Sequence, residues 1–172
     1  MVDFLKIDYL KVGNERQKAA HQLLIYHQIF KKLQDFDPIL TGTIPINIDT
    51  TASDLDIICY WTNKVDFINS INQAFANELN FILREVLIND EQTVIANFWL
   101  DDFELEIFGQ HIPTKSQNAY KHMVIEYQIL QKKGEDFRQQ VIDLKNQGFK
   151  TEPAFAKLLN LAGDPYISLL NY

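Results

Sequence analysis

The spacing of apolar residues changes along the chain from a helical to a strand-like period. Apolar residues from Leu23 to Leu33 recur at spacings of three and four, which predicts a helix capped by Asn14 and running to about Gln34. Apolar and polar residues then alternate in shorter segments, which is typical of half-buried strands. The predicted strands are residues 39–40, 54–60, 81–88, 93–100 and 103–108, with one helix at residues 66–79.

The last third of the chain has only helical periodicity. Glycines 134 and 148 predict the ends of helices at residues 118–133 and 135–147, because glycine commonly follows a helix terminus. Thr151 is the expected N-cap of a third helix, and Asp164-Pro165 opens a short last one. We therefore predict an α+β fold, a mixed β-sheet flanked by helices with a C-terminal helical region. Residues 1–112 form the core and residues 113–172 pack on it, in a single compact domain.

Composition and charge limit the classes of binding partner and the cellular location that we expect for this protein. Of the 172 residues, 47% are hydrophobic and 23% charged, which is ordinary globular composition. The net charge of −7 disfavours a nucleic-acid partner but is compatible with a nucleotide carried by Mg²⁺. Cys59 is the single cysteine, and the sequence has neither a signal-peptide pattern nor an apolar run of membrane-spanning length. We expect a cytoplasmic protein without a membrane partner; the sequence leaves its oligomeric state open.

Two carboxylates lie on one predicted strand, after a glycine-containing turn. Gly42-Thr43 is followed by ten residues and then by Asp54-Leu55-Asp56-Ile57. Alternation along the strand puts Asp54 and Asp56 on the same face, about 6–7 Å apart. Such a pair repels itself unless a cation lies nearby, and Mg²⁺ prefers carboxylate oxygens together with substrate phosphates. The pattern therefore predicts a divalent-metal site beside a phosphate-binding turn.

This segment resembles the signature of the polymerase-beta-like nucleotidyltransferase superfamily. In that signature, Gly-Ser or Gly-Gly precedes Asp-apolar-Asp by about ten residues, and a third carboxylate lies on a later strand. The resemblance implies that Asp54 and Asp56 bind catalytic Mg²⁺ or Mn²⁺. It also implies that Gly42 and Thr43 hold the triphosphate, with Ser53 beside them.

The third carboxylate has two candidates, Glu104 and Glu106, on one face of the strand at residues 103–108. Glu106 is favoured because Ile107 and Phe108 follow it, in the way that apolar residues bracket the third carboxylate of the superfamily. That group acts there as a metal ligand or as a base toward the acceptor hydroxyl. Glu104 stays as the alternative.

A closer resemblance extends over nearly the whole chain. The pattern is similar to that of an uncharacterised bacterial family, a domain of unknown function that we place in the same superfamily. The segments that carry the resemblance are residues 11–17, 42–46, 53–57, 119–123, 150–155 and 163–166. This resemblance implies the fold and the metal site without naming a substrate.

One departure from the superfamily concerns positive charge. Residues 44–53 contain no Arg or Lys, whereas many active members carry a basic residue there. Lys121 and His122, on the helix at residues 118–133, are candidates to meet a phosphate, and His122 is also a candidate acid or base. The competing interpretation is a solvated lysine and a histidine satisfied within the fold.

Two functions fit these observations. The first is a metal-dependent enzyme that transfers a nucleotidyl group from a nucleoside triphosphate to a hydroxyl of a small molecule or a protein. The second is a catalytically silent nucleotidyltransferase-like module that senses a nucleotide or pairs with a protein, for example in a toxin–antitoxin or stress setting. The missing cation favours the second function, and the three carboxylates favour the first.

Overall fold

A computed structural model describes residues 2–172 and contains a five-stranded mixed sheet with helices on both sides. The strands are β1 (Ile39–Thr41), β2 (Leu55–Tyr60), β3 (Leu79–Ile88), β4 (Glu91–Leu100) and β5 (Phe103–Gln110). The α-helices are α1 (Glu15–Tyr26), α2 (Ile29–Lys32), α3 (Lys64–Phe75), α4 (Asn118–Lys133), α5 (Glu135–Asn146), α6 (Thr151–Leu159) and α7 (Pro165–Leu170). Three short 3₁₀ segments are η1 (Asp8–Val12), η2 (Gln34–Phe36) and η3 (Thr114–Ser116).

The strand order is β1-β2-β5-β4-β3, so the two central carboxylate-bearing strands are neighbours. Strands β2 and β5 run parallel, and every other neighbouring pair is antiparallel. The predicted α+β class with a mixed sheet is therefore confirmed. Strands β3 and β4 begin two residues before the predicted limits, and β5 ends two residues after them.

The first predicted helix is wrong in one respect, because it is two helices. Asn14 caps α1 as expected, in a capping box with Gln17. The helix stops at Tyr26, and Gln28 adopts a left-handed conformation with φ of 54° before α2 begins. This break turns the chain so that Ile29 of α2 is buried against the sheet.

The caps of the two last helices differ from each other. Lys150 occupies the N-cap position of α6 without a side-chain bond, and Thr151 is the first helical residue, so the predicted cap is one residue too late. Asp164 caps α7 as expected, since its side chain accepts hydrogen bonds from the backbone of Tyr166 and Ile167. No helix among residues 2–172 is long and apolar enough to cross a bilayer.

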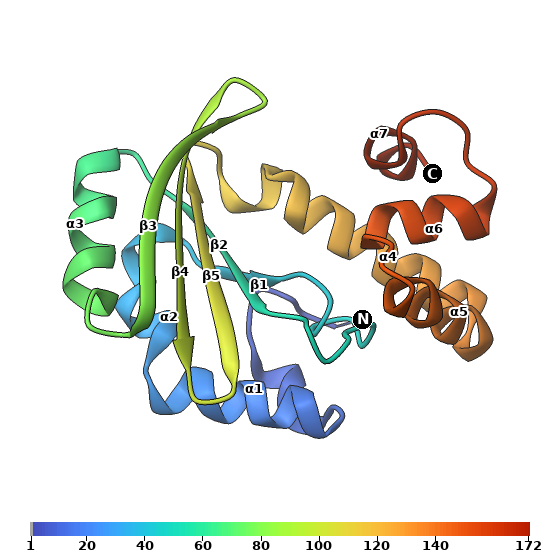
Figure 1. Cartoon of the computed structure of the whole chain (residues 1–172), viewed down its shortest axis with the longest axis horizontal. Helices are drawn as coiled ribbons and strands as arrows, with labels where there is room; N and C mark the ends of the chain where they lie inside the picture. The colour runs from blue at the N-terminus through green and yellow to red at the C-terminus, as the bar shows by residue number, and fades with distance from the viewer. Residues whose placement is uncertain (1) are drawn as a thin grey trace.

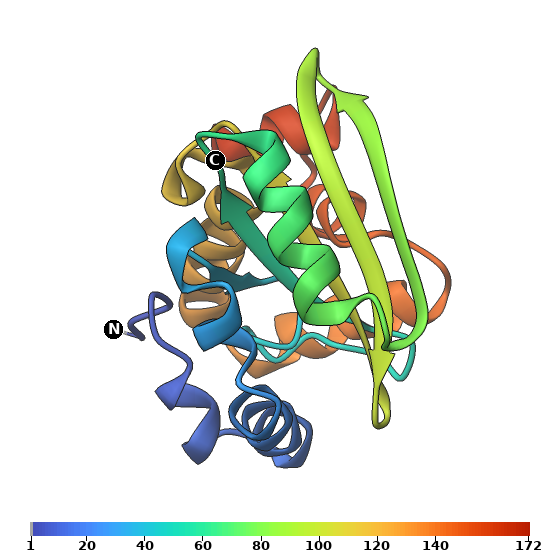
Figure 2. The same cartoon turned by 90° about the vertical axis from the view of Figure 1, so that its left-hand side faces the viewer.

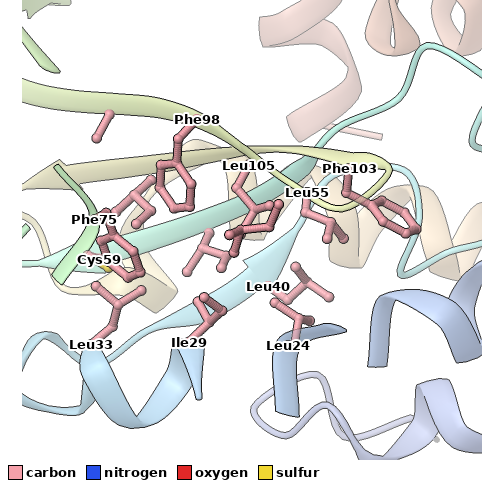
Figure 3. Close-up of a cluster of buried hydrophobic side chains, with 14 of the residues drawn as sticks. Leu24, Ile29, Leu33, Leu40, Leu55, Cys59, Phe75, Phe98, Phe103 and Leu105 are labelled. Carbon is pink, nitrogen blue, oxygen red and sulfur yellow. The ribbon is translucent and has the colours of Figure 1, made fainter. Parts of the chain in front are cut away.

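The two faces of the sheet are covered by different parts of the chain. Helix α3 lies against one face, and α4 to α7 lie on the opposite side (Figures 1 and 2). Beneath α1, α2 and α3, apolar residues from the sheet form the larger core, which includes Leu24, Leu55, Phe98 and Leu105 (Figure 3). Packing is tight enough that a Cβ on Gly109 of β5 would lie 2.2 Å from the ring of Phe67 in α3.

A second apolar cluster lies among the C-terminal helices. Its members from α4 to α7 include Met123, Val141 and Phe155. Ile46 and Ile48, from the loop between β1 and β2, also belong to this cluster. The loop that precedes the Asp54-Asp56 pair is therefore anchored in the helical region, which fixes its position relative to the open face of the sheet.

Candidate active site

A cavity of about 880 Å³ lies between the open face of the sheet and the C-terminal helices. Strands β2 and β5 form one wall, which we call the strand wall, and it carries Asp54, Asp56 and Glu106. The opposite wall, the helix wall, is formed by α4 and α6 and carries His122, Glu126 and Glu152 of α6's first turn. The loop after β1 and the tip of the β3–β4 hairpin form parts of the rim.

The register of the sheet places the strand-wall carboxylates together. Asp56 is paired with Glu106 across the parallel β2–β5 ladder, where neighbouring strands lie about 4.8 Å apart. Asp54 immediately precedes β2. Burial raises the pKa of Asp56, and repulsion from Asp54 and Glu106 raises it further. Burial also raises the pKa of Glu106. The wall therefore gathers negative charge that a divalent cation would relieve.

Glu106 is oriented by polar residues on the next two strands. The Asn97 side-chain amide of β4 donates to Glu106 Oε2 over 3.4 Å, and Arg84 of β3 lies 3.7 Å from the same oxygen. Arg84 also donates to Asn97 Oδ1 over 2.8 Å. Glu104, the alternative third carboxylate, is paired with Trp99 and does not line the cavity. The structure thus brings Glu106, rather than Glu104, to the aspartate pair.

The turn after β1 approaches the aspartates very closely. Gly42 has φ of +82°, and a Cβ at this position would lie 2.1 Å from Asp56 Oδ2. Only glycine fits both the left-handed backbone and this contact. The Thr43 hydroxyl donates to Ser53 Oγ over 3.1 Å, and that oxygen also accepts from the Thr50 amide over 3.0 Å. Gly42, Thr43 and Ser53 all line the cavity, beside the carboxylates.

Positive charge reaches the site from α5 rather than from the loop itself. Lys145 lines the cavity and donates to the Ile48 carbonyl over 2.8 Å. Burial lowers its pKa, while Asp49, Glu126, Asp56 and Asp54 act in the opposite direction. The sequence analysis missed Lys145, because a lysine in the last turn of a helix is an ordinary partner of the helix dipole. Its proximity depends on packing between residues 97 positions apart.

Lys121 and His122 separate in the structure. His122 is buried and faces the cavity, whereas Lys121 is exposed and is not among the cavity-lining residues. His122 Nδ1 has no hydrogen-bond partner among the described residues. Lys150, treated in the sequence only as the start of a helix, does line the cavity.

The ligand atoms of the two walls are spaced differently. Within residues 2–172, one group of three potential metal ligands has all its ligand atoms within 4.8 Å of one another. That group is His122, Glu126 and Glu152 on the helix wall, and not the strand-wall carboxylates. The sequence analysis considered His122 alone; the spacing of four between His122 and Glu126 on a predicted helix was the signal available for the pair.

Several solved structures share the fold of this chain. The GLD-2/RNP-8 complex structure matches with a TM-score of 0.55 at 16% identity, over 88% of this chain and 60% of that one. Cid1 poly (U) polymerase with bound MgGTP gives 0.53 at 12% identity, over 80% and 42%. The polymerase core of TRAMP, an RNA surveillance complex, gives 0.51 at 11% identity, over 95% and 50%. At such identities the likeness shows the fold alone, which is nucleotidyltransferase-like.

The chain spans only part of these proteins, between 42% and 60% of their length. No curated protein matches it. A family model described as "Domain of unknown function (DUF4269)" matches residues 22–172, which include both walls of the cavity. The chain therefore belongs to the DUF4269 family.

Proposed function

We propose that this protein is a divalent-metal-dependent nucleotidyltransferase that transfers a nucleotidyl group from a nucleoside triphosphate to a hydroxyl group. The observation that carries this proposal is the pairing of Asp56 with Glu106 across β2 and β5, directly beside Gly42. A phosphate-binding turn and clustered carboxylates are the two parts that nucleotidyl transfer requires, and here they share one cavity.

In the proposed reaction, the acceptor oxygen attacks the α-phosphorus of the triphosphate. A new oxygen–phosphorus bond forms, the bond between the α-phosphorus and its bridging oxygen breaks, and pyrophosphate leaves. Glu106 takes the proton of the attacking hydroxyl. Asn97 and Arg84 hold the Glu106 carboxylate in place. The Thr43 hydroxyl and the backbone around Gly42 bind the phosphates, with Lys145 as a half-buried cation that lines the same cavity.

The strand-wall residues fit Mg²⁺ or Mn²⁺. Their donors are all carboxylate oxygens, which hard divalent ions prefer. Burial raises the pKa of Asp56, and repulsion from Asp54 and Glu106, which a cation would offset, raises it further. Asp54, Asp56 and Glu106 are the residues proposed to hold it. When bound, such an ion neutralises developing charge on the phosphate oxygens.

The acceptor is proposed only by its chemical class. We favour a small molecule or a protein side chain because the chain is acidic, with a net charge of −7. The matching structures include a poly (U) polymerase and the polymerase core of an RNA surveillance complex, so RNA is the competing acceptor class. An acceptor assay therefore needs an RNA arm beside the protein and small-molecule arms.

A catalytically silent nucleotide-sensing or protein-binding module is the second candidate. The specific observation in its favour is that residues 44–53 carry no cation and that Lys145 donates to the Ile48 carbonyl. A silent module would bind a nucleotide without transferring it. The same assay separates the two functions, because it measures transfer and binding independently.

The test uses each nucleoside triphosphate labelled either at the α- or at the γ-phosphate, with Mg²⁺ or Mn²⁺. Three acceptor sets are supplied: RNA oligonucleotides, a mixture of folded and unfolded proteins, and hydroxyl-bearing small molecules. We expect the α-label, and not the γ-label, to join one acceptor set. The Asp54→Asn/Asp56→Asn variant should give background only. Nucleotide binding without α-label transfer would instead establish the silent module.

A further inference from the structure

The helix wall of the cavity carries a group of side chains that the proposed reaction does not use. His122 and Glu126 lie four residues apart on α4 and so share one face of the helix. Glu152 comes from the first turn of α6, a helix that packs on α5 and α7. One imidazole nitrogen of His122 and one carboxylate oxygen from each glutamate all lie within 4.8 Å of one another. Three side chains of the types that bind metal ions, from two different helices, therefore lie close together.

Two members of the group are buried without hydrogen-bond partners. Glu126 is 4% exposed and His122 is 6% exposed. Glu126 Oε1 and His122 Nδ1 have no partner among the described residues. A buried polar atom without a partner costs free energy, so such atoms usually mark a bound ion, a water or a functional site. Both orphaned atoms belong to residues of the same convergent group.

The charges around the group also favour a cation. Glu126 and Glu152 place carboxylate oxygens within 4.8 Å of each other, so the two groups repel when both are ionised. Lys145 lines the same cavity, but its amine donates to the Ile48 carbonyl. A cation bound between the two carboxylates would relieve their repulsion.

We propose that His122, Glu126 and Glu152 form a second metal site, for a transition ion of the Zn²⁺ class, with an open coordination position facing the cavity. The donor set of one imidazole and two carboxylates differs from the all-carboxylate strand wall. Imidazole with carboxylate suits Zn²⁺, Co²⁺ and Mn²⁺, whereas Mg²⁺ and Ca²⁺ prefer oxygen alone. Two ligands four residues apart on one helix, completed by a third from elsewhere, leave the fourth position of a tetrahedral ion free.

This inference goes beyond the proposed function and does not rest on it. Both walls line the same cavity, so an ion on the helix wall would face whatever occupies the space beside the strand wall. Binding at the helix wall can nevertheless be measured without nucleotide and without an acceptor. Failure of the transferase proposal would therefore leave this proposal standing, and the reverse also holds.

The experiment is a calorimetric titration of the chelator-treated full chain with Zn²⁺, paralleled by Co²⁺ and its visible absorption. We expect one equivalent to bind and Co²⁺ to show the intense visible band of a four-coordinate site. Glu126→Gln and Glu152→Gln keep the side-chain volume and should each weaken binding by roughly 10- to 100-fold or more. Far-ultraviolet circular dichroism would verify that each variant folds.

Three matched controls locate the ion. Glu15→Gln alters an exposed first-turn glutamate of α1, as Glu152 is a first-turn glutamate of α6, and should leave the affinity unchanged. His27→Ala removes a histidine that lies beside Asp101 away from the cavity and should also have no effect. Asp54→Asn/Asp56→Asn should retain the ion. Absence of binding, binding that survives in both glutamate variants, or loss with the aspartate pair would overturn the proposal.

Discussion

The two walls of the cavity are both acidic, but they are built in different ways. The strand wall takes one carboxylate from the residue that precedes β2, one from β2 itself and one from the paired position on β5. The helix wall takes its ligands from α4 and from α6, which are joined only through tertiary packing. Strand pairing fixes the strand wall by backbone hydrogen bonds, whereas the helix wall depends on how side chains of the second apolar cluster pack. A sequence pattern can therefore indicate the first wall far more readily than the second.

The difference also extends to the ions that each wall suits. Oxygen donors alone favour Mg²⁺ at the strand wall, and the His122 imidazole favours a softer ion at the helix wall. Lys145 lies between them and interacts with carboxylates of both. The two walls are therefore separable, and the substitutions at Glu106, Gly42 and Glu126 each change one wall while leaving the other intact.

The largest expected effect concerns the third carboxylate of the strand wall. Glu106→Gln removes the proposed base and should lower the rate of nucleotidyl transfer by roughly 10²- to 10⁴-fold. Glu104→Gln is the matched control, since Glu104 lies on the same strand but does not line the cavity. Steady-state transfer rates at saturating nucleotide would measure both. Equal losses in the two variants would contradict the assignment of Glu106.

The next effect is steric and comes from the turn beside Asp56. Gly42→Ala adds a Cβ 2.1 Å from Asp56 Oδ2 at a φ of +82°, and should cost about 2–4 kcal/mol of the free energy of unfolding. Gly163→Ala has a similar φ of +87° but nothing within 4 Å of the new Cβ, so it should cost only about 1 kcal/mol. Denaturant titration measures both, and similar losses would mean that the close approach to Asp56 does not matter.

A third effect is the dependence of stability on pH at the helix wall. Burial raises the pKa of Glu126 to about 8, whereas an unfolded glutamate titrates near about 4.3. Between these values the folded chain keeps a proton that the unfolded chain has released, so the stability falls as the pH rises. The slope is at most about 1.4 kcal/mol per pH unit.

Glu126→Gln should flatten this slope in chelator-treated protein, while Glu15→Gln should not. Asp56 and Glu106 also have raised pKa values and contribute in the same direction, so the variant keeps part of the dependence. Thermal unfolding between pH 5 and about 8.5 measures it. A slope that Glu126→Gln leaves unchanged would mean that Glu126 is ionised in the folded chain.

The smallest expected effect comes from the cation shared by the two walls. Lys145→Met removes the charge near the proposed phosphate position and should weaken nucleotide binding by about 1.5 kcal/mol, or roughly tenfold. Lys133→Met, at the exposed end of α4, serves as the control. Competition binding with a fluorescent nucleotide measures both. An unchanged nucleotide affinity of Lys145→Met would mean that Lys121 or another residue binds the phosphate.

Much of the strand wall followed from the sequence because its information is local. Alternation along residues 54–60 placed Asp54 and Asp56 on one face, and the spacing from Gly42 fitted a known signature. The choice between Glu104 and Glu106 rested on neighbouring apolar residues, and the register of β2 with β5 supplies an independent reason for Glu106.

The helix break, Lys145 and the helix wall could not be predicted from local sequence patterns. The break between α1 and α2 at Gln28 contains neither glycine nor proline, the residues that usually signal the end of a helix. The turn of the chain there follows from packing against the sheet. Lys145 reaches the loop from 97 residues away, and Glu152 lies near Glu126 because α5 and α7 contact both α4 and α6 and hold these two helices together. Such contacts depend on how whole helices pack, which a single sequence specifies only through the complete fold.

The most direct test of the central claim is thermal unfolding of the wild type and of Asp54→Asn/Asp56→Asn with Mg²⁺ or Mn²⁺ and each nucleoside triphosphate. A ligand at about 100 times its Kd adds roughly 2.7 kcal/mol, which corresponds to a rise in Tm of roughly 5–10 °C for a domain of this size. Only the ligand-induced increment is compared, because the variant also loses carboxylate repulsion. The account predicts a metal-dependent increment in the wild type that disappears in the variant. An increment equal in both proteins, or none with any triphosphate, would contradict a nucleotide site at the strand wall.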